Sequence, residues 1–357
     1  MKYAHLYSPL EMGDLRLRNR IVMAPMTRSR ARQDDDAVSE LQANYYGQRG
    51  DAGLIVTEGV HPSADGKGYN RTPGIYNDVH TAAWLSVTRR VHERGGLIAC
   101  QLMHCGRVGH ALNKGPNTRF LAPSAVAASA EIFTESGMQP MPTPEALTVA
   151  EVKSVVADYQ SAAARALQAG FDAVELHCAS GYLPAQFLAT GSNLRDDQYG
   201  GNLENRLRFI EDVLQAIKVE TGAGRIGLRI SPGNPYNDHV DNNPEETYAA
   251  LLQLADRMGL AWVHAIRMAS TGIDSLALSR ANFSGALIGS DSFDAGEADQ
   301  FIADGLVEAV SFGRAYIANP DLVTRFALDA PLNALDKRTI YAGEGAGGYT
   351  DYPNLSS

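Results

Sequence analysis

The chain has 357 residues, of which 45% are hydrophobic and 20% charged, a composition typical of globular proteins. Its net charge of −10 argues against binding to a phosphate backbone, so we expect no nucleic-acid partner. No apolar run reaches the roughly 20 residues needed to cross a bilayer, and the N-terminal residues lack a signal-peptide core, so we expect no membrane association. Three cysteines do not suggest a disulfide framework. Together these features predict a cytoplasmic protein.

Eight short apolar runs alternate with amphipathic segments, and each run is predicted to be a strand. The predicted strands are 21–26, 53–58, 97–104, 172–178, 226–231, 262–268, 286–289 and 309–312. The clearest predicted helix covers 148–169, where apolar residues recur at helical spacing until Gly170. This α/β pattern favours a (β/α)₈ TIM barrel formed by a single domain over residues 1–357, and an open doubly wound sheet is the alternative.

Three segments fall outside the repeat. Residues 8–19, with a Gly13-Asp14 turn, predict an N-terminal β-hairpin that closes the floor of the barrel. Residues 106–146 form a long loop after strand 3, and loops of this length are usually functional lids. The tail over 341–353 is rich in Gly and Tyr, and we expect it to fold over the barrel mouth.

Polar side chains end several predicted strands, where barrels of this kind place their active sites. Period-2 alternation puts Thr27, Gln101, His177 and Arg229 at the mouth. A hydroxyl, an amide, an imidazole and a guanidinium hydrogen-bond a planar heterocycle better than they coordinate a metal, so no metal site is expected. Alternatively, His177 is a structural residue and Arg229 pairs with Glu175.

The ends of strands 7 and 8 predict a phosphate site. Gly289 and Ser290 end the seventh strand, and Gly313 and Arg314 follow the eighth. Glycines allow a ligand to approach the backbone closely, and an arginine can pair with a phosphate. The alternative is two turn glycines beside a solvated arginine.

Motifs along nearly the whole chain then point to one family. They are NRIVMAPMTR at 19–28, YYGQR at 45–49, GLIVTEG at 53–59, QLMHCGR at 101–107, GFDAVELH at 170–177, DQYGG at 197–201, ENR at 204–206, FGR at 312–314, IANPDL at 317–322 and GYTDYP at 348–353. In these motifs the chain resembles the old yellow enzyme family of FMN-dependent ene-reductases, also described as NADH:flavin oxidoreductases.

The resemblance implies FMN as cofactor and NAD(P)H as electron donor, with ping-pong hydride transfer through flavin N5 to an activated C=C bond. The electrophilic alkene would be an α,β-unsaturated carbonyl or nitro compound. The implied cofactor-binding residues are Pro25, Met26 and Gly59 along the ring, Thr27 at the C4 carbonyl, Gln101 at the pyrimidine edge, Arg229 near N1, His177 above the ring, and Gly289, Ser290, Gly313 and Arg314 at the phosphate.

The resemblance also assigns catalytic roles. His177 and Ser180 would hold the substrate oxygen, and Tyr182 would donate the proton. Ser180 stands where most relatives carry His or Asn, and Met103 stands where many carry Trp. These departures, with a different loop over 269–279, predict a roomier pocket and an altered substrate preference.

Tyr69 and Tyr349 align with aromatic residues that line the substrate pocket of the family, whereas loop packing is the alternative for both.

Other functions are kept as alternatives. Ser180 and Met103 leave open an FMN-dependent desaturase or isomerase of a cyclic substrate. A flavin-free lyase or aldolase is disfavoured because no lysine lies on a predicted strand. A non-catalytic barrel is disfavoured because His177 and Tyr182 are both present. A thiol nucleophile at Cys105 or Cys178 is disfavoured too, and the protein is expected to be a monomer or homodimer.

Overall fold

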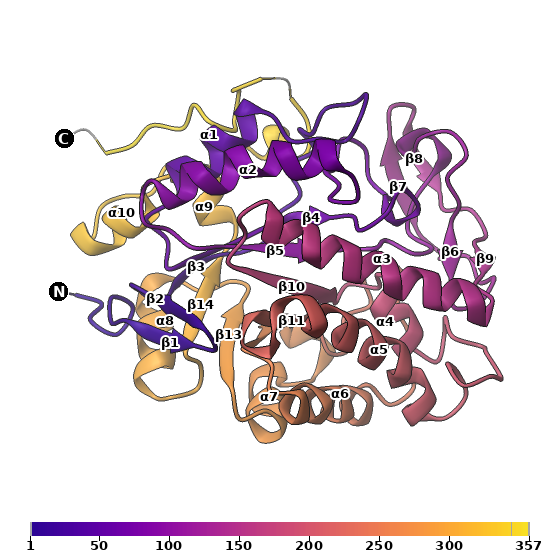
Figure 1. The fold of residues 1–357 in the computed structure, drawn as a ribbon. Helices are drawn as coiled ribbons and strands as arrows, with labels where there is room; N and C mark the ends of the chain where they lie inside the picture. The colour runs from indigo at the N-terminus through magenta and orange to yellow at the C-terminus, as the bar shows by residue number, and fades with distance from the viewer. Residues whose placement is uncertain (1, 344, 356–357) are drawn as a thin grey trace.

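The protein is described by a computed structural model that covers residues 2–343 and 345–355 (Figure 1). Eight parallel strands form a closed barrel, in which the last strand pairs with the first. The barrel strands are β3 (Ile21–Met23), β4 (Leu54–Val60), β5 (Ile98–Leu102), β10 (Ala173–Cys178), β11 (Ile226–Ile230), β12 (Trp262–Ile266), β13 (Ala286–Ser290) and β14 (Ala309–Phe312). The predicted (β/α)₈ barrel is therefore confirmed, and the open sheet is wrong.

Helices surround the barrel, as Figure 1 shows. They are α1 (Glu40–Gln48), α2 (Asp78–His92), α3 (Val149–Gln168), α4 (Leu183–Leu188), α5 (Leu203–Thr221), α6 (Pro244–Met258), α7 (Ser275–Asn282), α8 (Ala295–Ala303), α9 (Arg314–Ala318) and α10 (Leu322–Leu328). Helix α3 matches its prediction, because Thr148 and Glu151 form a capping box and Gly170 follows it with φ +84°. None of the described helices is long and apolar enough to cross a membrane.

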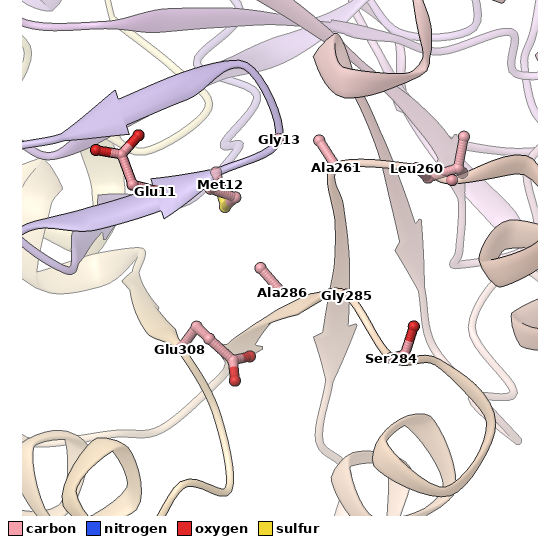
Figure 2. A pocket seen from close by; sticks show the side chains of 10 residues that line it. Glu11, Met12, Gly13, Leu260, Ala261, Ser284, Gly285, Ala286 and Glu308 are labelled. Atoms are coloured by element: carbon pink, nitrogen blue, oxygen red, sulfur yellow. The ribbon is translucent and has the colours of Figure 1, made fainter.

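The N-terminal hairpin closes one end of the barrel, as predicted. Strands β1 (Leu10–Met12) and β2 (Leu15–Leu17) pair antiparallel. Their apolar side chains pack against apolar residues of the barrel strands, including Trp262. Gly13 has φ +57°, and a Cβ there would lie 2.3 Å from the Gly224 carbonyl oxygen. A hollow of about 350 Å³ remains between the hairpin and the loops that precede β12 and β13 (Figure 2).

The long segment after β5 contains strands that the sequence did not reveal. Strands β7 (Glu131–Thr134) and β8 (Gly137–Pro140) form a second hairpin, and β6 (Leu121–Ala122) pairs with β9 (Glu145–Ala146). This second hairpin lies at the end of the barrel opposite β1 and β2 (Figure 1). Its residues line the large cavity at the barrel mouth, which is the position expected of a lid.

The C-terminal tail folds over the mouth, as predicted. Arg28, which is fully buried, donates to the carbonyls of Ile340 and Gly348 at 3.0 and 2.9 Å. Arg30 donates to the carbonyls of Thr339 and Ala342 at 2.9 and 3.1 Å. Because both arginines follow the first barrel strand, they tie the tail to the edge of the cavity.

Candidate active site

A cavity of about 1180 Å³ opens at the carboxyl ends of the barrel strands. The sequence-predicted residues along its wall are Pro25, Met26, Thr27, Gly59, Tyr69, Gln101, Met103, His177, Ser180, Tyr182, Arg229, Ser290, Gly313 and Arg314. Strand β3 ends at Met23, earlier than the predicted 26, because Pro25 has no N–H for a strand ladder. The extended residues after β3 therefore leave the sheet and face the cavity. The polar strand ends are thus brought together as expected.

A buried carboxylate organises the polar floor of this cavity. Glu175 on β10 accepts from Gln101 Nε2 and Trp262 Nε1, each at 2.9 Å. Its Oε2 also lies 2.9 Å from His264 Nδ1 on β12. Neither Glu175 nor His264 has any exposed side-chain area. The floor is therefore preorganised by hydrogen bonds that link β5, β10 and β12 across the barrel interior.

Arg229 on β11 connects this hydrogen-bond network to the cavity. Its Nη1 lies within 2.8 Å of both ring nitrogens of His264, and its Nη2 donates to Ser290 Oγ at 3.2 Å. No ion pair joins Arg229 directly to Glu175 among the described residues, which corrects the alternative of a simple Arg–Glu pair. Arg229 lines the cavity, whereas Glu175 and His264 lie behind it.

The charges in this network follow from burial. Burial and the Arg229 charge lower the pKa of His264 to about 4, so its ring is neutral at pH 7. Burial alone would raise the pKa of Glu175, but His264, Arg229 and the Trp262 donor hold it below its ordinary value. Burial lowers the pKa of Arg229 to about 10, which leaves it charged. The cavity floor therefore presents the Arg229 cation, and the Glu175 carboxylate that balances its charge lies behind it, with His264 between them.

The end of β10 presents a neutral imidazole beside a phenol. His177 Nδ1 accepts from the Ala179 amide at 3.2 Å, so Nε2 carries the ring proton in the neutral form. Burial and the nearby Arg229 lower the pKa of His177 to about 3. The Tyr182 ring lies 4.8 Å from the His177 ring in an edge-to-face arrangement, and burial raises the pKa of its hydroxyl. The pair thus offers two uncharged hydrogen-bond donors.

Ser180 occupies a constrained backbone position between these two side chains. Its φ is +55°, a left-handed conformation that is uncommon for serine. Its amide donates to Ser231 Oγ at 2.9 Å, and its carbonyl accepts from Asn237 Nδ2 at 2.8 Å. Both contacts use backbone atoms of Ser180, no described residue hydrogen-bonds its hydroxyl, and Ser180 lines the cavity.

The sequence matches the family model described as NADH:flavin oxidoreductase / NADH oxidase over residues 5–333. The chain belongs to this family. It is 39% identical over 98% of its length to a probable flavin mononucleotide-dependent alkene reductase of Leishmania infantum, of which 97% is covered. It is 36% identical over 99% of its length to 12-oxophytodienoate reductase 2 of Arabidopsis thaliana, of which 96% is covered.

Solved structures show the same family fold. Morphinone reductase in complex with tetrahydroNAD superposes with a TM-score of 0.93 at 44% identity, with 98% of both chains covered. The old yellow enzyme homologue of Zymomonas mobilis superposes with a TM-score of 0.93 at 36% identity, with 98% of this chain and 99% of that chain covered. The resemblance inferred from the motifs is therefore confirmed.

The structure corrects the predicted positions of two residues in this member of the NADH:flavin oxidoreductase family. Tyr349 does not line the cavity: it is fully buried, and its ring stacks on Tyr45 with centroids 4.0 Å apart. The packing alternative is thus the correct one for Tyr349, whereas Tyr341 of the same tail lines the cavity. Gly289 does not line the cavity either, and a Cβ there would lie 3.2 Å from the Phe293 ring and 3.3 Å from Val307 Cγ1.

Sequence reasoning missed several residues of the site. Tyr236 and Asn237 line the cavity from the loop after β11. Their position in a loop that follows a barrel strand could have predicted this, because such loops form the active sites of these barrels. His264 was missed although period-2 alternation along β12 puts it on the same face as Trp262. Its importance depends on its contact with Arg229, which only the closed barrel reveals.

The cysteines are buried, and no described group of metal-ligating residues forms a metal cluster. Burial raises the pKa of Cys105 to about 12 and the pKa of Cys178 still further. A thiolate is therefore strongly disfavoured at both positions, as the sequence indicated.

Proposed function

We propose that this chain is an FMN-dependent ene-reductase that takes electrons from NAD(P)H and reduces the activated C=C bond of a small unsaturated carbonyl or nitro compound. The observation that carries the proposal is one cavity that joins a buried cation, Arg229, to the neutral donors His177 and Tyr182. The family membership and the alkene reductase among its relatives support the same conclusion. We propose that residues 1–357 act as one FMN-binding domain.

The donor set of the cavity fits FMN. Gln101 and Arg229 provide an amide and a cation at the floor, suited to the carbonyl-rich edge of an isoalloxazine ring. Gly313 lines the cavity, and a Cβ there would make only ordinary van der Waals contacts, the nearest 3.5 Å from Met26 Sδ. Arg314 is exposed, and its Nη2 lies 3.5 Å from Ser292 Oγ and 3.9 Å from Asp291 Oδ1 in the loop that follows β13. A phosphate can reach the guanidinium there, in competition with the Asp291 carboxylate. We therefore assign Thr27, Gln101 and Arg229 to the ring and Ser290, Gly313 and Arg314 to the phosphate group.

FMN supplies the hydride chemistry when it is bound, and the side chains of the chain position the other reactant. His177 Nε2–H donates to the oxygen of the substrate, where negative charge grows as the alkene is reduced. Its lowered pKa keeps it a neutral donor throughout the physiological range. Such a donor contributes about 3–4 kcal/mol to the transition state. Ser180 is the second donor to that oxygen.

Tyr182 supplies the proton. Its hydroxyl is uncharged at neutral pH because burial raises its pKa, so the hydrogen is present when the substrate carbon needs it. The Tyr182 O–H bond breaks as a C–H bond forms on the substrate, and the phenol must afterwards regain a proton.

The test begins with the purified protein. We expect it to bind FMN, to be reduced anaerobically by NADH or NADPH, and to be reoxidised by 2-cyclohexenone or a nitroalkene. Tyr182→Phe should retain FMN and its reduction but lose most of the rate of reoxidation. A protein that binds no FMN, or whose reduced form no activated alkene reoxidises, would refute the proposal.

A second function keeps FMN but changes the chemistry. Ser180 in place of the larger donor of most relatives, and Met103 beside Gly59, favour a desaturase or isomerase of a cyclic substrate. Reduced enzyme would then be reoxidised only weakly by enones, and an unsaturated cyclic compound would be rearranged without net consumption of NAD(P)H.

A further inference from the structure

Two phenols meet in the wall of the cavity. The hydroxyl oxygens of Tyr69 and Tyr182 lie 3.0 Å apart, and either can be the donor. Their rings cross at 82° with centroids 6.2 Å apart. Among the described residues, neither hydroxyl makes another hydrogen bond. Tyr182 is 8% exposed and the Tyr69 side chain is partly buried. Burial also raises the pKa of the Tyr69 hydroxyl, so both phenols carry their protons at neutral pH.

The direction of this hydrogen bond follows from the number of protons. A phenol carries one hydrogen, so Tyr182 cannot direct its hydrogen at a substrate and at Tyr69 together. When Tyr182 is aimed at the substrate, its oxygen must accept from Tyr69. The same bond prevents the Tyr182 hydroxyl from rotating away from the cavity.

Proton transfer then leaves a negative charge on the Tyr182 oxygen, which is buried and therefore disfavours that charge. Burial raises the pKa of Tyr182, and neighbouring Cys105 and Tyr236 raise it further, while the hydrogen bond from Tyr69 lowers it. No cationic side chain contacts the Tyr182 hydroxyl among the described residues, and His177 is neutral. The Tyr69 hydroxyl is thus the group placed to stabilise that charge.

We propose that Tyr69 is a positioning residue for proton transfer: it orients the Tyr182 hydroxyl, stabilises the resulting phenolate and returns a proton to it. This inference rests on the proposed function. In the return step the Tyr69 O–H bond breaks and the Tyr182 O–H bond forms. Water in the cavity then reprotonates Tyr69, so the proton that entered the product comes from solvent and no other reactant is needed.

The test compares Tyr69→Phe with Tyr76→Phe, a control from the same loop whose hydroxyl makes no hydrogen bond among the described residues. Anaerobic stopped-flow measurements follow reduction by NADH and reoxidation by 2-cyclohexenone separately, in mixtures of H₂O and D₂O. Loss of a hydrogen bond to a charged group should slow reoxidation of Tyr69→Phe by about 10- to 100-fold, with reduction unchanged. The rate should also depend linearly on the deuterium fraction in Tyr69→Phe and non-linearly in the wild type and Tyr76→Phe.

The result that overturns the inference is a Tyr69→Phe enzyme whose reoxidation rate and deuterium dependence match those of the wild type. The Tyr182→Phe variant distinguishes a failure of this inference from a failure of the proposed function. If Tyr182→Phe is slow and Tyr69→Phe is not, only this inference fails. If Tyr182→Phe is as fast as the wild type, the proton donor of the proposed function is wrong, and the inference fails with it.

Discussion

Replacing Ser180 with asparagine should increase the rate at which the reduced enzyme is reoxidised by small enones. Ser180 has φ +55°, and asparagine tolerates this left-handed conformation better than other non-glycine residues. The backbone contacts of Ser180 with Ser231 and Asn237 involve no side-chain atom of Ser180. The substitution therefore adds a longer donor to the cavity wall and leaves the local fold in place.

The size of the effect follows from what a donor contributes to a developing oxyanion. One such donor is worth about 3–4 kcal/mol when it is well placed. Ser180 already provides part of this contribution, because it lines the cavity together with His177 and Tyr182. We expect the remainder, about 2 kcal/mol, to raise kcat/KM by roughly 30-fold.

The assay is anaerobic reoxidation of the photoreduced enzyme by 2-cyclohexenone, at matched FMN content. Ser180→Ala is the control, and loss of the remaining contribution of serine, about 1–2 kcal/mol, should lower the rate by about 5- to 30-fold. An asparagine variant that is equal to or slower than the wild type would refute the reasoning. It would show that the substrate oxygen is not held at position 180.

Three further results are expected. Met103→Trp should narrow the cavity, because Met103 already packs tightly on Gly59: a Cβ on Gly59 would lie 2.4 Å from Met103 Cε. Competition assays should show that the ratio of kcat/KM for small enones to that for bulky enones rises at least tenfold. Arg30→Met should lower the free energy of unfolding by about 2–4 kcal/mol in a denaturant titration, since Arg30 donates to several tail carbonyls; a change below about 1 kcal/mol would contradict this. His104→Asn should make the free energy of unfolding less sensitive to acid. Burial lowers the pKa of His104 to about 3 in the folded protein, whereas its pKa in the unfolded chain is about 6.5. Below pH 6.5 the unfolded state therefore binds a proton that the folded state does not bind, and the folded state loses stability. Between pH 7 and pH 5 the wild type should therefore lose about 2 kcal/mol more stability than this variant, and parallel pH profiles would show that His104 is not the cause.

Much of the fold follows from local patterns in the sequence. A helix such as α3 is determined by a capping box, an apolar stripe and a terminal glycine, all of which lie within about twenty residues of one another. The side-chain period of two along a strand likewise indicates which residues, such as Gln101 and Arg229, point into the barrel. The β7–β8 hairpin was missed because each strand has only four residues, too few to show an alternating pattern, and the two strands pair with each other rather than with the barrel.

The sequence by itself determined the order of the eight βα units, the residues at the strand ends and the family of the chain. Only the tertiary structure decided that His264 connects Glu175 to Arg229, that Tyr349 is packing rather than pocket wall, and that Tyr69 reaches Tyr182 across 113 positions. The physical reason is that hydrophobic periodicity and capping act over a few residues, whereas hydrogen bonds between distant side chains depend on how the barrel closes.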